Sequence, residues 1–179
     1  MPKSIVAFGA SNSTQSINKR FASYAAHQIA DAEINLLDLN DYEMPIYSMD
    51  REKASGIPAQ AQQFLDHLRS ADGIVISFAE HNGAYSAAFK NIFDWVSRID
   101  NKLWGDKPML LLATSPGGRG GQTVLDIAKN KFKFMNTNTL ASFSLPLFHQ
   151  HFSEEEGIKD EALKASFEAA LQVFVQALG

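Results

Sequence analysis

The fold of this chain is decided by the stretch Gly9-Ala10-Ser11-Asn12-Ser13-Thr14-Gln15-Ser16-Ile17-Asn18. The segment before it, residues 5–8, is short and apolar, which predicts a buried strand. The segment after it carries apolar residues at helical spacing, at positions 17, 21, 25 and 29. The stretch is therefore expected to join the carboxyl end of a strand to the amino end of a helix.

This loop is predicted to bind a phosphate group. Unpaired backbone N–H groups and the positive end of the helix dipole favour an anion at such a position. Ser11, Ser13, Thr14 and Ser16 add hydroxyl donors, and Asn18 adds an amide. A helix cap alone needs one such residue, whereas six of the eight residues from 11 to 18 are Ser, Thr or Asn. The loop lacks the Gly-Lys-Ser/Thr of an ATP-binding loop and the Gly-x-Gly-x-x-Gly of a dinucleotide site, which indicates a phosphate monoester.

The composition is typical of one globular domain over residues 1–179, with 45% hydrophobic and 20% charged residues. A net charge of -4 gives no general attraction for nucleic acid or acidic lipid. The absence of cysteine excludes disulfides, thiolate metal sites and thiol redox chemistry. With no signal-like segment and no apolar run long enough for a membrane span, the expected location is the cytoplasm.

Four more strands are predicted, at residues 33–39, 73–78, 108–113 and 139–145. Helices are expected from residue 58, after residue 84, over 122–134 and at the end of the chain, with a long loop over residues 40–57. Alternating strands and helices predict an α/β fold with a parallel sheet covered on both faces, wound 2-1-3-4-5. The ligand site is then expected at the carboxyl ends of the first and third strands.

Two other turns close strands at this edge, residues 80–83 and residues 115–121. Gly83 and the glycines at 117, 118, 120 and 121 let the backbone approach a flat ligand with polar edges, such as a flavin. The alternative is a merely flexible loop. Four glycines in five residues cost folding entropy without any packing, which favours a function.

No acid–base pair or nucleophile is evident. His149 and His151 would face the same way on an extended segment and suggest a metal pair, but no third ligand accompanies them, so a solvated or interface role is favoured. Glu80 is either a general base or an outward-facing turn residue, and the second interpretation is favoured. Trp95 and Trp104 are expected to serve packing or an interface.

The chain resembles the NADPH-dependent FMN reductase family of flavodoxin-like proteins, which includes quinone, azo and chromate reductases. The family motif Gly-Ser-x-Arg-x-x-Ser-x-Asn is matched by residues 10–18, and Pro-Glu-Tyr-Asn-x-Ser by residues 79–84. The following Leu-Lys-Asn-x-x-Asp-Trp is matched by Phe-Lys-Asn-Ile-Phe-Asp-Trp at residues 89–95, and a glycine-rich turn follows the fourth strand. The resemblance implies a three-layer α/β/α sandwich with a five-stranded parallel sheet.

The resemblance also assigns roles to residues. The phosphate of FMN would lie against Ser11, Ser13, Ser16, Ile17 and Asn18. The isoalloxazine would be bordered by Glu80, His81, Asn82 and Gly83, and its pyrimidine side would meet Ser115, Gly117 and Gly118. Lys90, Asn91, Asp94 and Trp95 would be structural or dimer-forming.

Three residues depart from the family pattern. Ser13 stands where the family has arginine, which removes a charged phosphate contact. Ala79 stands in place of proline, and His81 in place of an aromatic residue that shapes the flavin pocket.

The function expected from this resemblance is an FMN-containing oxidoreductase that uses NADPH or NADH to reduce quinone-like or other small electron acceptors, including free FMN. Hydride transfer passes directly to the flavin, so no catalytic side chain is predicted. A homodimer or homotetramer is expected, with a contact through residues 84–99 and Trp104, because this helix is apolar on more than one face. The alternative is a flavodoxin-like electron carrier, or an FMN-bound regulatory protein with little turnover.

Overall fold

A computed structural model describes residues 1–179 and contains a five-stranded sheet in the order β2-β1-β3-β6-β7. Every strand in it pairs parallel with its neighbours. The strands are β1 (Lys3–Ala10), β2 (Ala32–Leu37), β3 (Gly73–Phe78), β6 (Met109–Thr114) and β7 (Leu140–Leu145). The predicted 2-1-3-4-5 order is confirmed, because β6 and β7 are the fourth and fifth strands of this sheet.

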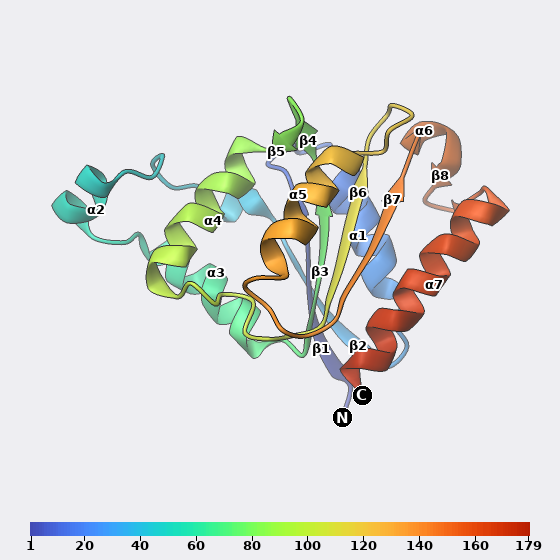
Figure 1. The fold of residues 1–179 in the computed structure, drawn as a ribbon, viewed down its shortest axis with the longest axis horizontal. Coiled ribbons are helices and arrows are strands. Elements are labelled where there is room, and N and C mark those ends of the chain that lie inside the picture. Colours follow the sequence, from blue (N-terminus) through green and yellow to red (C-terminus); the bar gives the residue numbers. More distant parts are fainter.

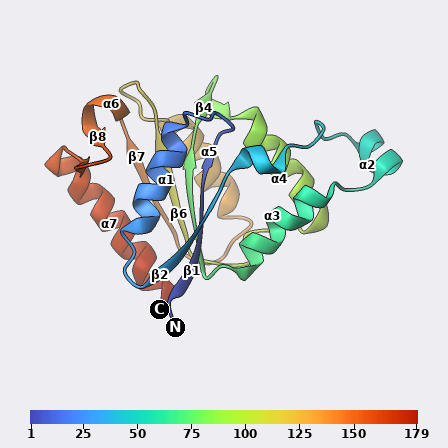
Figure 2. The ribbon, with the colours of Figure 1, turned by 180° about the vertical axis from the view of Figure 1, so that it is seen from behind.

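Helices cover both faces of the sheet (Figures 1 and 2). One face carries α1 (Ile17–His27) and α7 (Glu161–Leu178), and the other carries α3 (Ala59–Ser70), α4 (Ala87–Ile99) and α5 (Gln122–Phe132). The residues of β3 and β6 are all buried, and alternate ones belong to the two different cores: Val75 packs with Phe21 of α1, and Ile76 with Phe64 of α3. This two-sided burial explains why these strands read as continuous apolar runs.

The predicted loop over residues 40–57 is only partly a loop. It contains a 3₁₀ turn, η1 (Leu39–Tyr42), and a short helix, α2 (Met49–Ser55), whose N-cap Ser48 accepts a hydrogen bond from the Arg51 N–H. No residue of α2 is buried, so the helix has no apolar stripe that a sequence pattern can reveal. Figure 1 shows α2 standing away from the layered body; residues 43–57 are called the arm below.

The arm is fastened to α4 by side chains of the Lys-Asn-x-x-Asp-Trp segment. The Asn91 amide donates to the carbonyls of Met44 and Pro45, at 3.0 and 3.2 Å, and its oxygen accepts from the Tyr47 N–H at 2.8 Å. The Trp95 indole N–H donates to the Pro45 carbonyl at 2.7 Å. Asn91 and Trp95 therefore have a structural role, which is one of the two roles expected for them (structural or dimer-forming).

A dimer contact through residues 84–99 and Trp104 was expected because α4 is apolar on more than one face, and the structure shows that this reason is wrong. Trp104 is 0% exposed, and Phe89, Trp95 and Val96 are also buried. Phe93 stacks on Trp104, and Trp104 packs on Phe132 of α5, so the apolar sides of α4 are covered within the chain. A helix apolar on several faces needs burial on several faces, and here the neighbouring helices and the arm supply it.

Small elements complete the fold. They are β4 (Glu80–His81), β5 (Ala84–Tyr85), α6 (Phe148–His151), β8 (Phe152–Ser153) and β9 (Gly157–Ile158). His149 and His151 lie in α6 and not on an extended segment, so residues two apart point in different directions and the suggested metal pair loses its basis. None of the helices is both long and apolar enough to span a bilayer.

Candidate functional site

Three turns meet at the carboxyl edge of the sheet and enclose a pocket of about 280 Å³. They follow β1, β3 and β6, which are neighbours in the sheet. The pocket, called the carboxyl-edge pocket below, is lined by Ser11, Ser13, Gln15, Ser16, Ile17, Asn18, Ala79, Glu80, His81, Thr114, Ser115 and Pro116. The structure therefore brings together all five predicted residues of the first turn, two of the second and one of the third.

Four predicted residues do not line this pocket: Asn82, Gly83, Gly117 and Gly118. Four lining residues were not predicted: Gln15, Ala79, Thr114 and Pro116. Gln15 lies inside the quoted loop, and the other three flank predicted residues. Only their position next to a strand end could have predicted that they line the pocket. The residue type gives no such signal for Ala79 and Pro116, because alanine and proline side chains have no polar group for a ligand.

The serine loop, residues 11–16, is held by its own hydroxyl groups. The Ser11 and Ser13 hydroxyl oxygens accept from the N–H groups of Ser13 and Gln15, at 3.1 and 3.2 Å. The Ser16 hydroxyl caps α1 by accepting from the Lys19 N–H at 3.1 Å. A hydroxyl that accepts in this way keeps its own hydrogen free to donate.

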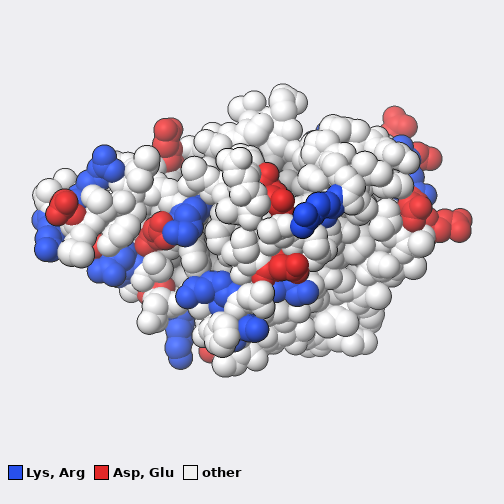
Figure 3. All heavy atoms as spheres, turned by 45° about the horizontal axis from the view of Figure 1, so that its top comes forward, with Lys and Arg blue, Asp and Glu red and all other residues white.

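Two backbone donors add to these hydroxyls. The N–H groups of Ile17 and Asn18, in the first turn of α1, have no hydrogen-bond partner within the chain. Hydroxyl hydrogens and free N–H groups at a helix amino end form a donor set that matches a phosphate. Figure 3 shows acidic and basic side chains scattered over this side of the molecule, with uncharged areas between them.

The Asn18 side chain does not point at a ligand, which corrects the predicted role of its amide. Asn18 is 3% exposed. Its Nδ2 donates to the Thr114 carbonyl at 3.1 Å, and its Oδ1 accepts from the Thr114 N–H at 3.1 Å and from the Ser77 hydroxyl at 2.7 Å. The amide ties α1 to the ends of β3 and β6, so Asn18 offers a ligand its backbone N–H.

Gly9 allows β1 to approach α1 closely. A Cβ atom at this position would lie 2.3 Å from the Lys19 nitrogen, a distance that no side chain tolerates. The glycine before the serine loop therefore serves the close packing of strand and helix.

Glu80 does not face outward, so the favoured prediction for this residue is wrong. It is half-buried, and its Oε2 accepts from the Val124 N–H of α5 at 2.9 Å. The N-cap of α5 is Gly121, which has no side chain to cap the helix, and Glu80 does so from the neighbouring turn. Its carboxylate also places a negative charge at the positive end of the α5 dipole.

The glycines of the third turn divide into two pairs. Gly120 and Gly121 have positive φ, at 59° and 73°, and a Cβ on Gly120 would lie 2.5 Å from the Ser144 hydroxyl. These two are explained by the backbone itself. Gly117 and Gly118 are exposed and face open space, with nothing within 4 Å of a Cβ at Gly118. Only this second pair leaves room for a ligand.

Comparisons with known proteins agree with this arrangement. A sequence profile described as NADPH-dependent FMN reductase matches residues 4–166. A quinone reductase of Escherichia coli K12 is 34% identical over 92 residues, which cover 51% of this chain and 48% of that protein. An NADPH:quinone oxidoreductase of Arabidopsis thaliana is 28% identical over 142 residues, covering 78% and 71%. The match thus spans about half the length of the bacterial relative.

The fold has solved counterparts. A flavoenzyme NAD(P)H:(acceptor) oxidoreductase from Paracoccus denitrificans superposes with a TM-score of 0.74 at 21% identity, covering 98% of this chain and 97% of that one. The likeness confirms the flavodoxin-like fold, and the profile match extends over nearly the whole sequence. The chain belongs to the NADPH-dependent FMN reductase family.

Proposed function

We propose that this protein is an NAD(P)H-dependent FMN oxidoreductase that reduces quinone-like or other small electron acceptors, free FMN among them. The observation that carries the proposal is the donor set of the serine loop, at the edge where a doubly wound sheet binds its ligand. The family membership and the quinone reductases among the relatives support it.

The phosphate of FMN would be held by the hydroxyls of Ser11, Ser13 and Ser16 and by the N–H groups of Ile17 and Asn18. Ser13 stands where the family has arginine, so hydrogen bonds from neutral groups replace an ion pair in this chain. Such bonds to a charged acceptor are worth about 1.5–3 kcal/mol each, so several of them suffice for tight binding.

The flavin ring would lie toward the second and third turns. Glu80, His81, Asn82 and Gly83 would border the isoalloxazine, and Ser115, Gly117 and Gly118 would meet its pyrimidine side. Bound FMN supplies the hydride chemistry between the nicotinamide and the acceptor. The protein residues bind and orient the flavin. No side chain is required to transfer a proton, and the Glu80 carboxylate is occupied by the hydrogen bond that it accepts from the Val124 N–H.

Oligomerisation and location are part of the proposal. We place the contact of a homodimer or homotetramer at the arm, where Ile46 is 76% and Met49 60% exposed. Burying both side chains against a second copy would gain about 1.5–3 kcal/mol for each. Light scattering at a multiple of 19.7 kDa would support this, and the mass of one chain at micromolar concentration would contradict it. A cytoplasmic location follows from the proposed donor, NAD(P)H.

The test of the phosphate site is a pair of matched substitutions in the serine loop. Ser11→Asp places a carboxylate next to the phosphate and should lower the affinity for FMN by more than about a hundredfold. The neutral Ser11→Asn should lower this affinity by about tenfold. Both should fold, because either side chain can accept the Ser13 N–H as Ser11 does. FMN affinity by flavin fluorescence and the melting temperature give the answer.

If Ser11→Asp stays folded and binds FMN as the wild type does, the phosphate does not lie in this loop. Turnover is a separate question. Steady consumption of NAD(P)H with a quinone supports an enzyme, and binding of FMN without turnover supports the carrier or regulatory alternative.

A further inference from the structure

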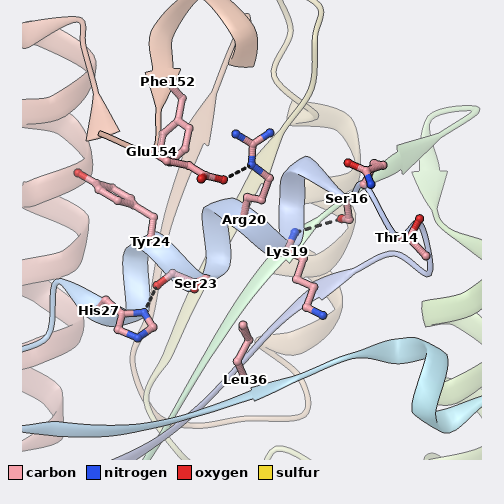
Figure 4. A pocket seen from close by; sticks show the side chains of 11 residues that line it. Thr14, Ser16, Lys19, Arg20, Ser23, Tyr24, His27, Leu36, Phe152 and Glu154 are labelled. Atoms are coloured by element: carbon pink, nitrogen blue, oxygen red, sulfur yellow. Dashed lines mark hydrogen bonds and ion pairs between the residues drawn. The ribbon is translucent and has the colours of Figure 1, made fainter. Parts of the chain in front are cut away.

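A second and larger hollow, of about 500 Å³, runs along the outer side of α1. Its floor is one stripe of that helix: Ser16, Lys19, Arg20, Ser23, Tyr24 and His27, spaced by three or four residues. Leu36 of β2 forms one wall, and Phe152 of β8 with Glu154 forms the other (Figure 4). We call this hollow the α1 groove; of the residues that line it, the proposed function uses only Ser16.

The α1 groove borders the carboxyl-edge pocket. Gln15 and Ser16 line both of them. Ser16 is also one of the residues proposed to hold phosphate. The serine loop therefore lies at the boundary between the two hollows, and a ligand long enough to pass over Gln15 and Ser16 can occupy both.

Arg20 gives the groove a site for an anion. Its Nε donates to Glu154 at 2.8 Å, and its two terminal nitrogens have no partner (Figure 4). The guanidinium lies over the Phe148 ring, 5.3 Å from its centroid, which limits where the group can move. The Glu154 side chain is 71% exposed, and an exposed ion pair is weak, so a phosphate can replace this carboxylate.

Lys19 is not equivalent to Arg20. Its Nζ lies 2.5 Å from Asp38, and this bond holds the pKa of the Asp38 carboxyl below its usual range. Lys19 is therefore committed to its partner and neutralises it. Arg20 has the more exposed carboxylate partner, at 71% against 33%, so its ion pair is the easier one for an incoming anion to replace.

The other end of the groove is suited to a purine. The His27 Nδ1 bonds to the Ser23 carbonyl at 2.7 Å, and since a carbonyl only accepts, Nδ1 carries the hydrogen. In the neutral ring Nε2 is then an acceptor, of the kind that an exocyclic amine needs. The Tyr24 ring, edge-on to Phe152 at 5.2 Å, and Leu36 offer apolar contact beside it.

The spacing of these groups matches a nucleotide. Arg20 and His27 are seven residues apart on one helix, which corresponds to ~10 Å along its axis, comparable to an extended nucleoside monophosphate. We propose that the α1 groove binds the adenosine monophosphate half of a dinucleotide, with its phosphate at Arg20 and its base at Tyr24 and His27. The other half rests on the proposed function: for FAD it is the flavin mononucleotide half in the carboxyl-edge pocket, and for NAD(P)H it is the nicotinamide half beside bound FMN. The same adenosine phosphate occurs in FAD and in NAD(P)H.

The first test is calorimetric titration of flavin-free protein with 5′-AMP. Arg20→Gln should weaken AMP binding about tenfold, and Glu154→Gln should strengthen it severalfold, because it removes the competing carboxylate. The control is Arg69→Gln, which breaks a comparable exposed pair with Asp100 far from the groove and should leave AMP affinity unchanged. Opposite effects of the two groove variants are not expected of a structural ion pair. No AMP binding, or equal affinity in the wild type and both variants, overturns the proposal.

The second test identifies the dinucleotide by competition. If FAD displaces AMP and binds the wild type more tightly than FMN does, and Arg20→Gln abolishes that difference, the source is FAD. If NADP⁺ displaces AMP from the FMN-loaded protein, the source is the nicotinamide dinucleotide. If neither displaces AMP, the dinucleotide assignment is wrong. As a control, the FMN affinity of Arg20→Gln should equal that of the wild type. If the wild type binds AMP but not FMN, the proposed function is refuted and the α1 groove is still a nucleotide site.

Discussion

The carboxylate of Glu80 accepts a hydrogen bond from the backbone N–H of Val124, 44 residues further along the chain, at 2.9 Å. The bond joins the turn after β3 to the first turn of α5. The turn after β3 is thereby fixed, without a ligand, to the helix that follows the third turn of the carboxyl-edge pocket.

Glu80→Ala should lower the free energy of unfolding by about 0.5–2 kcal/mol, the usual cost of a lost helix cap. Glu80→Gln should cost less, since its amide oxygen can still accept the Val124 N–H although it brings no charge to the helix end. Urea denaturation measures both. Equal stability of Glu80→Ala and the wild type would show that the bond contributes nothing.

Asn18→Ala should be among the most destabilising single substitutions at the site. It leaves the Thr114 N–H, the Thr114 carbonyl and the Ser77 hydroxyl without a buried partner. Unpaired buried groups cost about 1–3 kcal/mol each, so a loss of at least ~3 kcal/mol is expected. The control Ser77→Ala removes only one of these bonds and should cost about 1 kcal/mol. A mild effect of Asn18→Ala in urea denaturation would contradict this reading of its side chain.

Tyr85 has a buried hydroxyl without a hydrogen-bond partner, and burial raises its pKa from 10.0 to about 12. The unfolded chain loses this proton first, so the free energy of unfolding should fall as pH rises from about 10 to 12. Tyr85→Phe removes the group and should make this decline shallower. At neutral pH the variant should be as stable as the wild type or slightly more so, because no bond is lost.

Thermal melts of both proteins at several alkaline pH values test this expectation. Identical alkaline profiles would mean that the Tyr85 phenol ionises as freely in the folded chain as in the unfolded one.

Asn91→Ala should release the base of the arm, since it removes three hydrogen bonds to residues 44–47. We expect limited proteolysis within residues 48–57 to become several times faster, because local opening there costs less free energy. The neighbouring Lys90→Ala is a matched control. It breaks only an exposed i,i+4 pair with Asp94, worth about 0.3–0.5 kcal/mol. Equal cleavage rates in both variants would show that Asn91 does not anchor the arm.

Local patterns were sufficient for the positions of the sheet strands, and the order of the sheet then followed from the usual winding of five parallel strands. β3 and β6 read as apolar runs, the helices showed apolar stripes at helical spacing, and the turns rich in Ser and Gly all followed strands. Because parallel strands end at the same edge, these turns had to meet there. Five of the predicted site residues, Ser11, Ser13, Ser16, Ile17 and Asn18, accordingly line the pocket.

The directions of the side chains were decided only by the tertiary structure. Asn18 turns inward because the ends of β3 and β6 offer it three buried partners, and Glu80 turns to α5 because Gly121 leaves that helix without a cap. Trp104 is buried because Phe93 and Phe132 lie around it.

The partner in each of these contacts lies far away in the chain, and periodicity reports only which face of an element is apolar. The helix α2 of the arm was not predicted because it buries no residue. The α1 groove was not predicted because its walls come from β2 and β8, which are distant in the sequence. The sequence by itself determined the five strands of the sheet, the long helices on its faces and the edge at which the proposed ligand would bind. Which atoms remain free to bind it depended on hydrogen bonds and packing between distant segments.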